Sequence, residues 1–253
     1  MLRPILALLL LLLCPTPAAA QGVVSSADPR GSAAGQEILR KGGSATDAAM
    51  AMMLALTVVE PQSSGIGGGG FLLHHDGRMG TVDTIDGRET APAAATPDRF
   101  VGPDGKALAF RDAFPGGRSV GVPGNIALMA RAHAKWGRLP WADLFAPAIR
   151  LARDGFVVNA TLAKGLNRVA PLWSNFPEAR AIYWRDGKPA QQGMTLTNPA
   201  LAAFLARLAA EGLAAEVAES LPALPPQSLL LVRRITLALP GLVRWWQHPL
   251  PRG

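Results

Sequence analysis

The chain has 253 residues, 49% of them hydrophobic, which is enough for one domain with a sizeable core. Its net charge is +7. The basic residues are scattered singly, with no cluster beyond Arg233-Arg234, and this favours a solvated basic surface over nucleic-acid binding. The only cysteine is Cys14, in the segment that we expect to be removed. The mature chain would then have no disulfide, thiol nucleophile or cysteine metal ligand.

Residues 1–20 predict a secretory signal peptide. Arg3 supplies the positive charge, Ile5–Leu13 the apolar core, and Ala18-Ala19-Ala20 the small residues before the cleavage point. The apolar run is too short to span a bilayer. We therefore expect a periplasmic or secreted protein with no stable membrane span. An uncleaved membrane anchor is the alternative.

Two helices are predicted next. Asp28 is a suitable N-cap for a helix over Pro29–Lys41, with proline at its first position. Ser44 is the N-cap of a second helix, Ala45–Val59, whose sequence carries no charge after its first turn. A helix that is apolar on all sides is predicted to lie in the core.

A glycine-rich loop follows the second helix. Gly65–Gly70 formally matches the G-x-G-x-x-G pattern of dinucleotide-binding proteins. That motif requires a strand before it and a helix after it, whereas here the order is reversed, so we exclude this interpretation. The glycines instead indicate a close approach of backbone segments. The segments Phe71–His75 and Thr81–Asp86 predict a hairpin joined through a turn at Asp76-Gly77.

The rest of the chain predicts helices separated by turns. Thr96–Phe114 is expected to be irregular. Helices are expected over Pro123–Trp136, Trp141–Asp154 and Ala200–Glu211. Turns rich in proline and amide residues are expected from Gly155 to about Asn198.

Three strings in this order resemble the γ-glutamyltransferase (γ-glutamyltranspeptidase, glutathione hydrolase) family: EPQSSGIGGGGF, DGRETAPAAATPDRF and SVGVPGNIALMARAHAKWGRLPWADLFAPAIRLARDGFVVN. The resemblance runs from about Val23 to Gly212, so residues 21–212 form a region like the family's large subunit. It implies an α/β fold of the N-terminal nucleophile hydrolase type, an αββα sandwich. This chain would hold an incomplete, mostly helical part of that fold with one β-hairpin, and no cofactor.

The resemblance also implies a reaction. Members of the family hydrolyse or transfer the γ-glutamyl group of glutathione, using a threonine that self-cleavage makes N-terminal. That threonine opens the small subunit, in a string like Thr-Thr-His. None of the four histidines, His74, His75, His133 and His248, follows such a pair. We therefore assign no catalytic residue to this chain and expect it to be a truncated enzyme, inactive without a small subunit.

One substrate-binding residue is implied by the family's DGRE-like string. Arg88 would bind the α-carboxylate of a γ-glutamyl substrate such as glutathione. A planar guanidinium can bind a carboxylate through two parallel hydrogen bonds, which fixes its orientation. The alternative is a surface arginine that pairs with Glu89 or Asp86.

Other polar residues are weaker candidates. His74 and His75 are adjacent on a strand, so they point to opposite faces and cannot share a metal. Asp83 and Asp86 are more easily explained by a structural role at a strand end. Ser63-Ser64 has no base placed near it and is expected to bond the backbone of the glycine loop. No spacing of metal ligands is present, and we predict no metal site.

The tail, residues 213–253, has a different composition. No acidic residue follows Glu219, and the family resemblance stops near Gly212. The tail is either a genuine variant C-terminus or the product of a shifted reading frame. The second is favoured because resemblance and charge balance are lost together.

Two other functions stay open. One is a non-catalytic protein that binds glutamyl compounds or a partner chain. The other is a relative of the family that acts on poly-γ-glutamate or on β-lactam acyl side chains.

Overall fold

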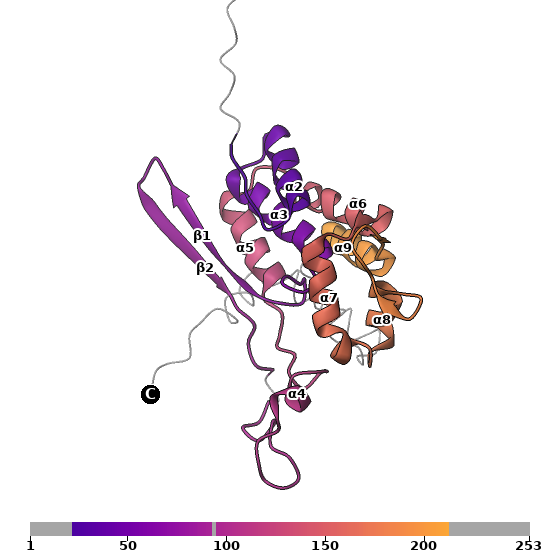
Figure 1. Ribbon diagram of the computed structural model, residues 1–253. Coiled ribbons are helices and arrows are strands. Elements are labelled where there is room, and N and C mark those ends of the chain that lie inside the picture. The colour runs from indigo at the N-terminus through magenta and orange to yellow at the C-terminus, as the bar shows by residue number, and fades with distance from the viewer. Residues whose placement is uncertain (1–21, 93–94, 213–253) are drawn as a thin grey trace, which may run out of the picture.

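The computed structural model describes residues 22–92 and 95–212. The described part begins with two helices that pack against each other, α2 (Pro29–Arg40) and α3 (Ala45–Val59) (Figure 1). The predicted N-cap at Ser44 is confirmed and forms a capping box, because the Ser44 side chain accepts from the backbone of Asp47 while the Asp47 side chain accepts from the backbone of Ser44. Helix α3 packs against α2, α5 and α6. Its buried residues, among them Leu54 and Val59, confirm the prediction of a core helix.

The predicted hairpin is also confirmed. Strands β1 (Gly70–Asp76) and β2 (Thr81–Gly87) pair antiparallel and project from the helices (Figure 1). One face of the hairpin lies on α5 (Asn125–Trp136), where the His74 ring stacks on Trp136 with ring centroids 4.2 Å apart. The opposite face leaves Phe71 and Leu73 largely exposed.

The helices after the hairpin complete the core, with two corrections to the predicted bounds. Helix α5 begins at Asn125 with Gly124 as its N-cap, two residues later than expected. The helix expected over Trp141–Asp154 consists of a 3₁₀ turn, η1 (Trp141–Phe145), followed by α6 (Ala146–Asp154). Proline in the first turn of α6 explains the division, because proline suits the start of an α-helix and not its interior.

A larger correction concerns the segment from Gly155 to Asn198, which was expected to consist of turns. It contains α7 (Ala160–Trp173) and α8 (Pro177–Tyr183). Asn159 caps α7 by accepting a hydrogen bond from the Leu162 backbone, and Leu162 and Leu166 are fully buried. Pro171 lies in the last turn of α7. The proline therefore disturbs the helix only near its end, and α7 stops two residues later.

The remaining elements are short. They are α4 (Phe110–Ala113), inside a segment expected to be irregular, the paired strands β3 (Phe156–Val157) and β6 (Thr195–Leu196), and the paired strands β4 (Trp184–Arg185) and β5 (Lys188–Pro189). Helix α9 (Pro199–Glu211) ends the described part and packs on α6. Over residues 22–92 and 95–212, the strands form three two-stranded sheets.

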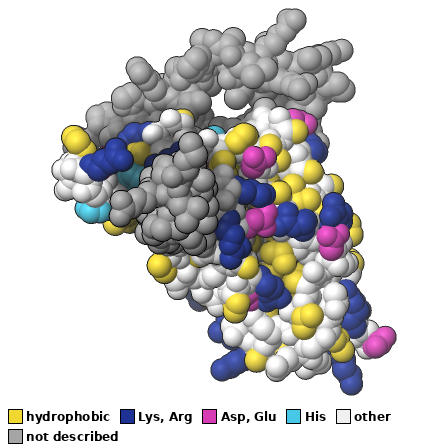
Figure 2. All heavy atoms as spheres, turned by 90° about the horizontal axis from the view of Figure 1, so that it is seen from above, with side chains coloured by type: hydrophobic (Ala, Val, Ile, Leu, Met, Phe, Trp, Pro, Cys, Tyr) yellow, Lys and Arg dark blue, Asp and Glu magenta, His cyan; other side chains and the backbone are white. Residues whose placement is uncertain are grey.

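The described surface carries both signs of charge. Figure 2 shows Lys and Arg side chains spread over the visible face, with Asp and Glu among them. No helix among the described residues is long and apolar enough to cross a membrane. The predicted signal peptide and the tail from residue 213 onward lie outside the described residues.

Candidate functional site

Arg88 lies directly after β2, at the base of the hairpin. Its side chain is 70% exposed. The backbone N–H of Arg88 donates to Oδ1 of Asp86 at 2.9 Å, and its Nε lies 3.0 Å from Oε2 of Glu89. Both partners named in the surface-arginine alternative therefore contact Arg88, one through its backbone and the other through its side chain.

Three backbone segments meet beside Arg88, at a place that we call the glycine junction: Gly68, Gly69, Gly87 and Gly124. A Cβ atom added to Gly69 would lie 2.5 Å from the Gly87 carbonyl oxygen and 2.9 Å from the Arg88 Cα. A Cβ atom added to Gly124 would lie 2.0 Å from the same carbonyl oxygen. Real Cβ atoms do not come so close to backbone, so only glycine fits. The predicted close approach of backbone segments is confirmed.

Asn125 binds the glycine loop to the start of α5. Its Nδ2 donates to the Gly65 carbonyl oxygen at 2.7 Å. The backbone N–H groups of Gly124 and Asn125 both donate to the Gly68 carbonyl oxygen, at 3.0 and 3.1 Å. The Asn125 side chain is buried, and its Oδ1 has no hydrogen-bond partner among the described residues. These contacts hold the glycine loop in place, and Gly69 of this loop lies against the backbone of Gly87 and Arg88.

Glu89 occupies the other side of the junction. A Cβ atom added to Gly68 would lie 3.4 Å from Glu89 Oε1, and one added to Gly121 would lie 2.9 Å from Glu89 Cβ. Thr90 pairs with Val122 in an isolated bridge. Glu89 is thus held between the glycine loop and the segment that leads into α5. Its carboxylate faces the Arg88 guanidinium from a fixed position.

The arrangement suits the binding of a carboxylate. The terminal Nη atoms of Arg88 form no hydrogen bond with any of the described residues, since only Nε is engaged by Glu89. Two parallel N–H groups on an exposed guanidinium can bind a carboxylate in bidentate fashion. Within residues 22–92 and 95–212, no three His, Cys, Asp or Glu side chains are grouped so that they could hold a metal.

The two strand histidines lie on opposite faces, as expected. His74 faces the helices, where its Nδ1 lies 3.2 Å from Oγ1 of Thr46. Its neighbour His75 is paired with Val82 in the strand register. His133 contacts the Leu139 carbonyl oxygen through Nε2 at 2.8 Å. The structure brings none of these side chains to Arg88.

The other weak candidates also have structural contacts. Asp83 pairs with Lys135 on α5. The expected hydrogen bonds from the Ser63 and Ser64 side chains to the glycine loop are not found among the described residues. Their backbone N–H groups donate to the Glu60 carbonyl oxygen instead, because the chain turns tightly at the end of α3.

Asn125 was not among the residues that the sequence pattern singled out. Its contact with Gly65 joins positions sixty residues apart. A single sequence contains no signal for such a pairing. The only available hint was its place at the start of a predicted helix, where asparagine ordinarily suggests a cap.

Comparisons with known proteins identify the family of the chain. The profile described as gamma-glutamyltranspeptidase matches residues 31–219. The chain is 42% identical over 191 residues to glutathione hydrolase 3 of Arabidopsis thaliana, covering 76% of this chain and 29% of that protein. It is 39% identical over 181 residues to the glutathione hydrolase proenzyme of Bacillus subtilis, covering 72% of this chain and 31% of that one.

Among solved structures, the chain is similar to the gamma-glutamyltranspeptidase of Helicobacter pylori, with a TM-score of 0.74 and 30% identity. The match covers 79% of this chain and 57% of that one. The chain thus spans about a third of the curated relatives and over half of the solved chain. The predicted α/β fold of the N-terminal nucleophile hydrolase type is confirmed as an incomplete part of it. The chain belongs to the gamma-glutamyltranspeptidase family.

Proposed function

We propose that this chain provides the glutamyl-binding part of a γ-glutamyltransferase or glutathione hydrolase. In this proposal Arg88 holds the α-carboxylate of a γ-glutamyl compound such as glutathione. The observation that carries the proposal is the pair of unengaged Nη atoms on an exposed arginine whose backbone is fixed at the glycine junction. Glu89 contributes by restraining the guanidinium from the Nε side, which leaves the fork open.

The reaction would be acyl transfer from the γ-carbonyl to water or to an amine. It requires a nucleophile, and the printed sequence has no Thr-Thr-His-like string. We propose that a small-subunit segment, separate from this sequence, provides the threonine and the groups that stabilise the oxyanion. Several relatives are named proenzymes, which supports the need for processing before activity.

The place of action would be the periplasm or the exterior. The support is the N-terminal pattern of Arg3, an apolar run and Ala18-Ala19-Ala20. A membrane surface and nucleic acid are not among the partners that we propose.

Two tests separate the enzyme from a non-catalytic binding protein. The purified chain is mixed with γ-glutamyl-p-nitroanilide, alone and after co-expression with the small-subunit part of the Bacillus subtilis relative. We expect no turnover from the chain alone and turnover after co-expression. Activity of the chain alone that survives further purification would refute the assignment of the nucleophile to another segment.

Binding without complementation favours the alternative. If co-expression yields no activity but calorimetry detects glutamate or glutathione bound to the chain, a non-catalytic glutamyl-binding protein is the better description. Sequencing the DNA directly downstream is a second test. A Thr-Thr-His string in another frame there would support the truncated enzyme. Selectivity for poly-γ-glutamate or β-lactam acyl groups would be measured on the complemented enzyme.

A further inference from the structure

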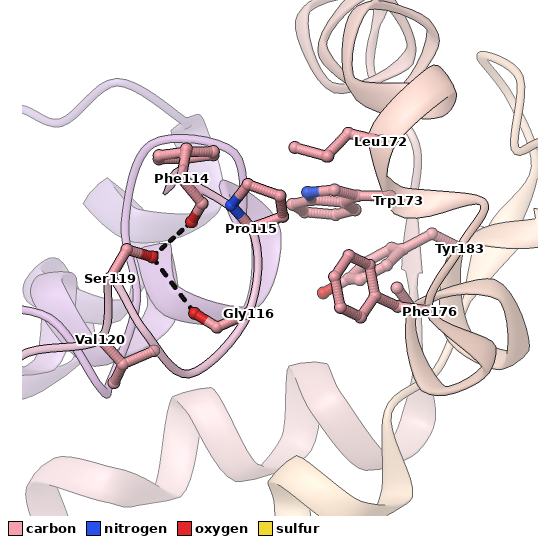
Figure 3. Close-up of a pocket in the computed structure, with 10 residues that line it drawn as sticks. Phe114, Pro115, Gly116, Ser119, Val120, Leu172, Trp173, Phe176 and Tyr183 are labelled. Carbon is pink, nitrogen blue, oxygen red and sulfur yellow. Dashed lines mark hydrogen bonds between the residues drawn. The ribbon is translucent and has the colours of Figure 1, made fainter. Parts of the chain in front are cut away.

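A cavity of about 340 Å³ lies between the loop that leads into α5 and the helices α7 and α8 (Figure 3). We call it the aromatic groove and define it by Phe114, Pro115, Val120, Trp173, Phe176 and Tyr183. Figure 3 shows Trp173, Phe176 and Tyr183 facing the loop, with Pro115 beside the indole. The volume lies at the lower end of the range of sites for small molecules, about 300–1,000 Å³.

The loop wall of the groove is held in shape by its own hydrogen bonds. The Ser119 hydroxyl contacts the carbonyl oxygens of Phe114 and Gly116, which closes the loop on itself (Figure 3). The helix wall is held by the packing of the Trp173 and Tyr183 rings, whose centroids are 5.5 Å apart. Both walls are therefore formed before any ligand arrives.

Two hydrogen-bond donors in the groove have no partner within the described part of the chain. Neither the Trp173 indole N–H nor the Tyr183 hydroxyl forms a hydrogen bond with the described residues. In Figure 3 the Tyr183 hydroxyl points toward the loop, and the indole nitrogen lies on the side that faces Pro115. Burial raises the pKa of Tyr183 to about 12, so its hydroxyl keeps its proton and remains a donor. Such donors call for an oxygen acceptor on the ligand.

The groove is connected to the Arg88 site through a single stretch of backbone. Val120 lines the groove, the next residue lies against the Glu89 side chain, and Val122 donates its N–H to the Thr90 carbonyl oxygen at 2.8 Å. The segment that ends the groove therefore borders the residue that restrains Arg88.

We propose that the aromatic groove binds the amine half of a γ-glutamyl compound, an aromatic or large apolar amino acid whose carboxylate accepts hydrogen bonds from Tyr183 and Trp173. The inference rests on the proposed function, in which Arg88 holds the glutamyl half. It adds a preference within γ-glutamyl compounds, because glycine in the same position would leave the rings uncovered. Aromatic side chains stack on such rings and remove apolar area from water.

The test is calorimetric titration of the whole mature chain with γ-glutamylphenylalanine and γ-glutamylglycine. We expect the phenylalanine compound to bind about tenfold tighter, the usual gain from burying one large apolar side chain. Ala179→Phe fills the groove from α8 and should abolish the preference. Ala203→Phe, on the exposed face of α9, is the matched control and should keep it.

A second variant tests the polar contact. Tyr183→Phe keeps the ring and removes the hydroxyl, so the affinity for γ-glutamylphenylalanine should fall about threefold to tenfold. The affinity for γ-glutamylphenethylamine, which lacks the carboxylate, should not change. A preference that survives Ala179→Phe, equal affinities for the two dipeptides, or no binding of γ-glutamylphenylalanine would each overturn the proposal. A groove that accommodates another polypeptide segment would give equal affinities.

Arg88→Ala distinguishes this inference from the proposed function. This substitution should lower the affinity for both dipeptides by the same factor and leave the ratio of the two affinities unchanged. If the affinity for neither dipeptide falls, the proposed role of Arg88 is wrong. The ratio of the two affinities still tests whether the groove binds the phenylalanine side chain. If both are weakened but the wild-type chain shows no preference for phenylalanine, the groove fails and the role of Arg88 stands.

Discussion

The Asn125 side chain donates a hydrogen bond of 2.7 Å to the Gly65 carbonyl oxygen, and so ties the start of α5 to the glycine loop. The backbone of Asn125 also donates to the Gly68 carbonyl oxygen. One buried residue therefore satisfies two carbonyl groups of a loop that has few side chains of its own. Glycine provides no side-chain packing atoms, so the loop depends on contacts of this kind, together with the Gly124 N–H that donates to the same Gly68 carbonyl oxygen.

Asn125→Ala should destabilise the chain by about 0.5–1.5 kcal/mol, the net value of a typical hydrogen bond, because the buried Asn125 side chain no longer donates to the Gly65 carbonyl oxygen. The measurement is chemical denaturation followed by circular dichroism. Asn175→Ala, in the exposed turn between α7 and α8, is the control and should change stability by less than about 0.5 kcal/mol. Equal effects of the two substitutions would show that the Asn125 contact does not hold the loop.

Two neighbouring glycines give a matched pair. A Cβ atom at Gly69 would meet the backbone of Gly87, Arg88 and Glu89, whereas one at Gly67 would have nothing within 4 Å. Gly69→Ala should cost at least the 1–3 kcal/mol that is roughly typical of overpacking, because backbone cannot rotate away. Gly67→Ala should be close to neutral. Thermal unfolding of both variants measures the difference, and similar melting temperatures would contradict the tight junction.

Local patterns in the sequence predicted the elements that local chemistry determines. The N-cap at Ser44, the hairpin turn at Asp76-Gly77 and the all-apolar helix were all found where expected. Helix α7 was not predicted because Gly165 and Pro171 count as helix breakers in a local pattern. Its stability comes from the Asn159 cap and from leucines buried by distant elements.

The candidate site was only partly predictable for the same reason. Arg88 was implied by the family string around it, and the glycine loop by its composition. The position of the loop depends on contacts with Gly124 and Asn125, which lie more than fifty residues further along the chain. Hydrophobic periodicity and turn chemistry report on neighbours in sequence, so they contain no information about such contacts. The aromatic groove, formed by two separate segments, was unpredictable on the same grounds.

The carboxyl group of Asp28 should make the stability of the folded chain depend on pH in the acidic range. Burial alone would raise the pKa of Asp28, but hydrogen bonds from Arg30 and Asn159, with the Arg30 charge, lower it below the usual value. A lowered folded-state pKa contributes stability that is present above the unfolded value, about 3.9, and is lost as the pH falls through the folded value. Asp28→Asn should therefore lower stability at pH 6 more than at pH 2. Denaturation at both pH values measures this, with exposed Asp112→Asn as the control.

Export should remove residues 1–20. The Ala18-Ala19-Ala20 run favours cleavage before Gln21, because signal peptidase accepts small residues at this point. Mass spectrometry of the chain from the periplasmic fraction should give a mature N-terminus at Gln21. Ala18→Leu, which places a bulky residue three positions before the cut, should slow processing. A chain in the envelope fraction that still begins at Met1 would refute the signal-peptide prediction.

The final prediction concerns Arg88 in an enzyme complemented with a small subunit. Its guanidinium would hold the α-carboxylate in the ground state and in the transition state alike. Arg88→Ala should therefore act mainly on KM, with a smaller fall in kcat from misorientation. A charge-assisted contact of this kind is worth about 1.5–3 kcal/mol, which corresponds to roughly tenfold to a hundredfold in affinity. Arg78→Ala, in the exposed hairpin turn, is the matched control.

Arg88→Lys separates charge from geometry. An ammonium keeps the positive charge but loses the planar fork, so this variant should recover only part of the affinity. Self-cleavage should proceed in both Arg88 variants, since it uses the threonine and not the substrate carboxylate. Processing is followed by gel electrophoresis and the kinetics with glutathione. If Arg88→Ala is processed normally and keeps the wild-type KM, Arg88 only restrains Glu89 at the glycine junction, and the carboxylate must bind elsewhere.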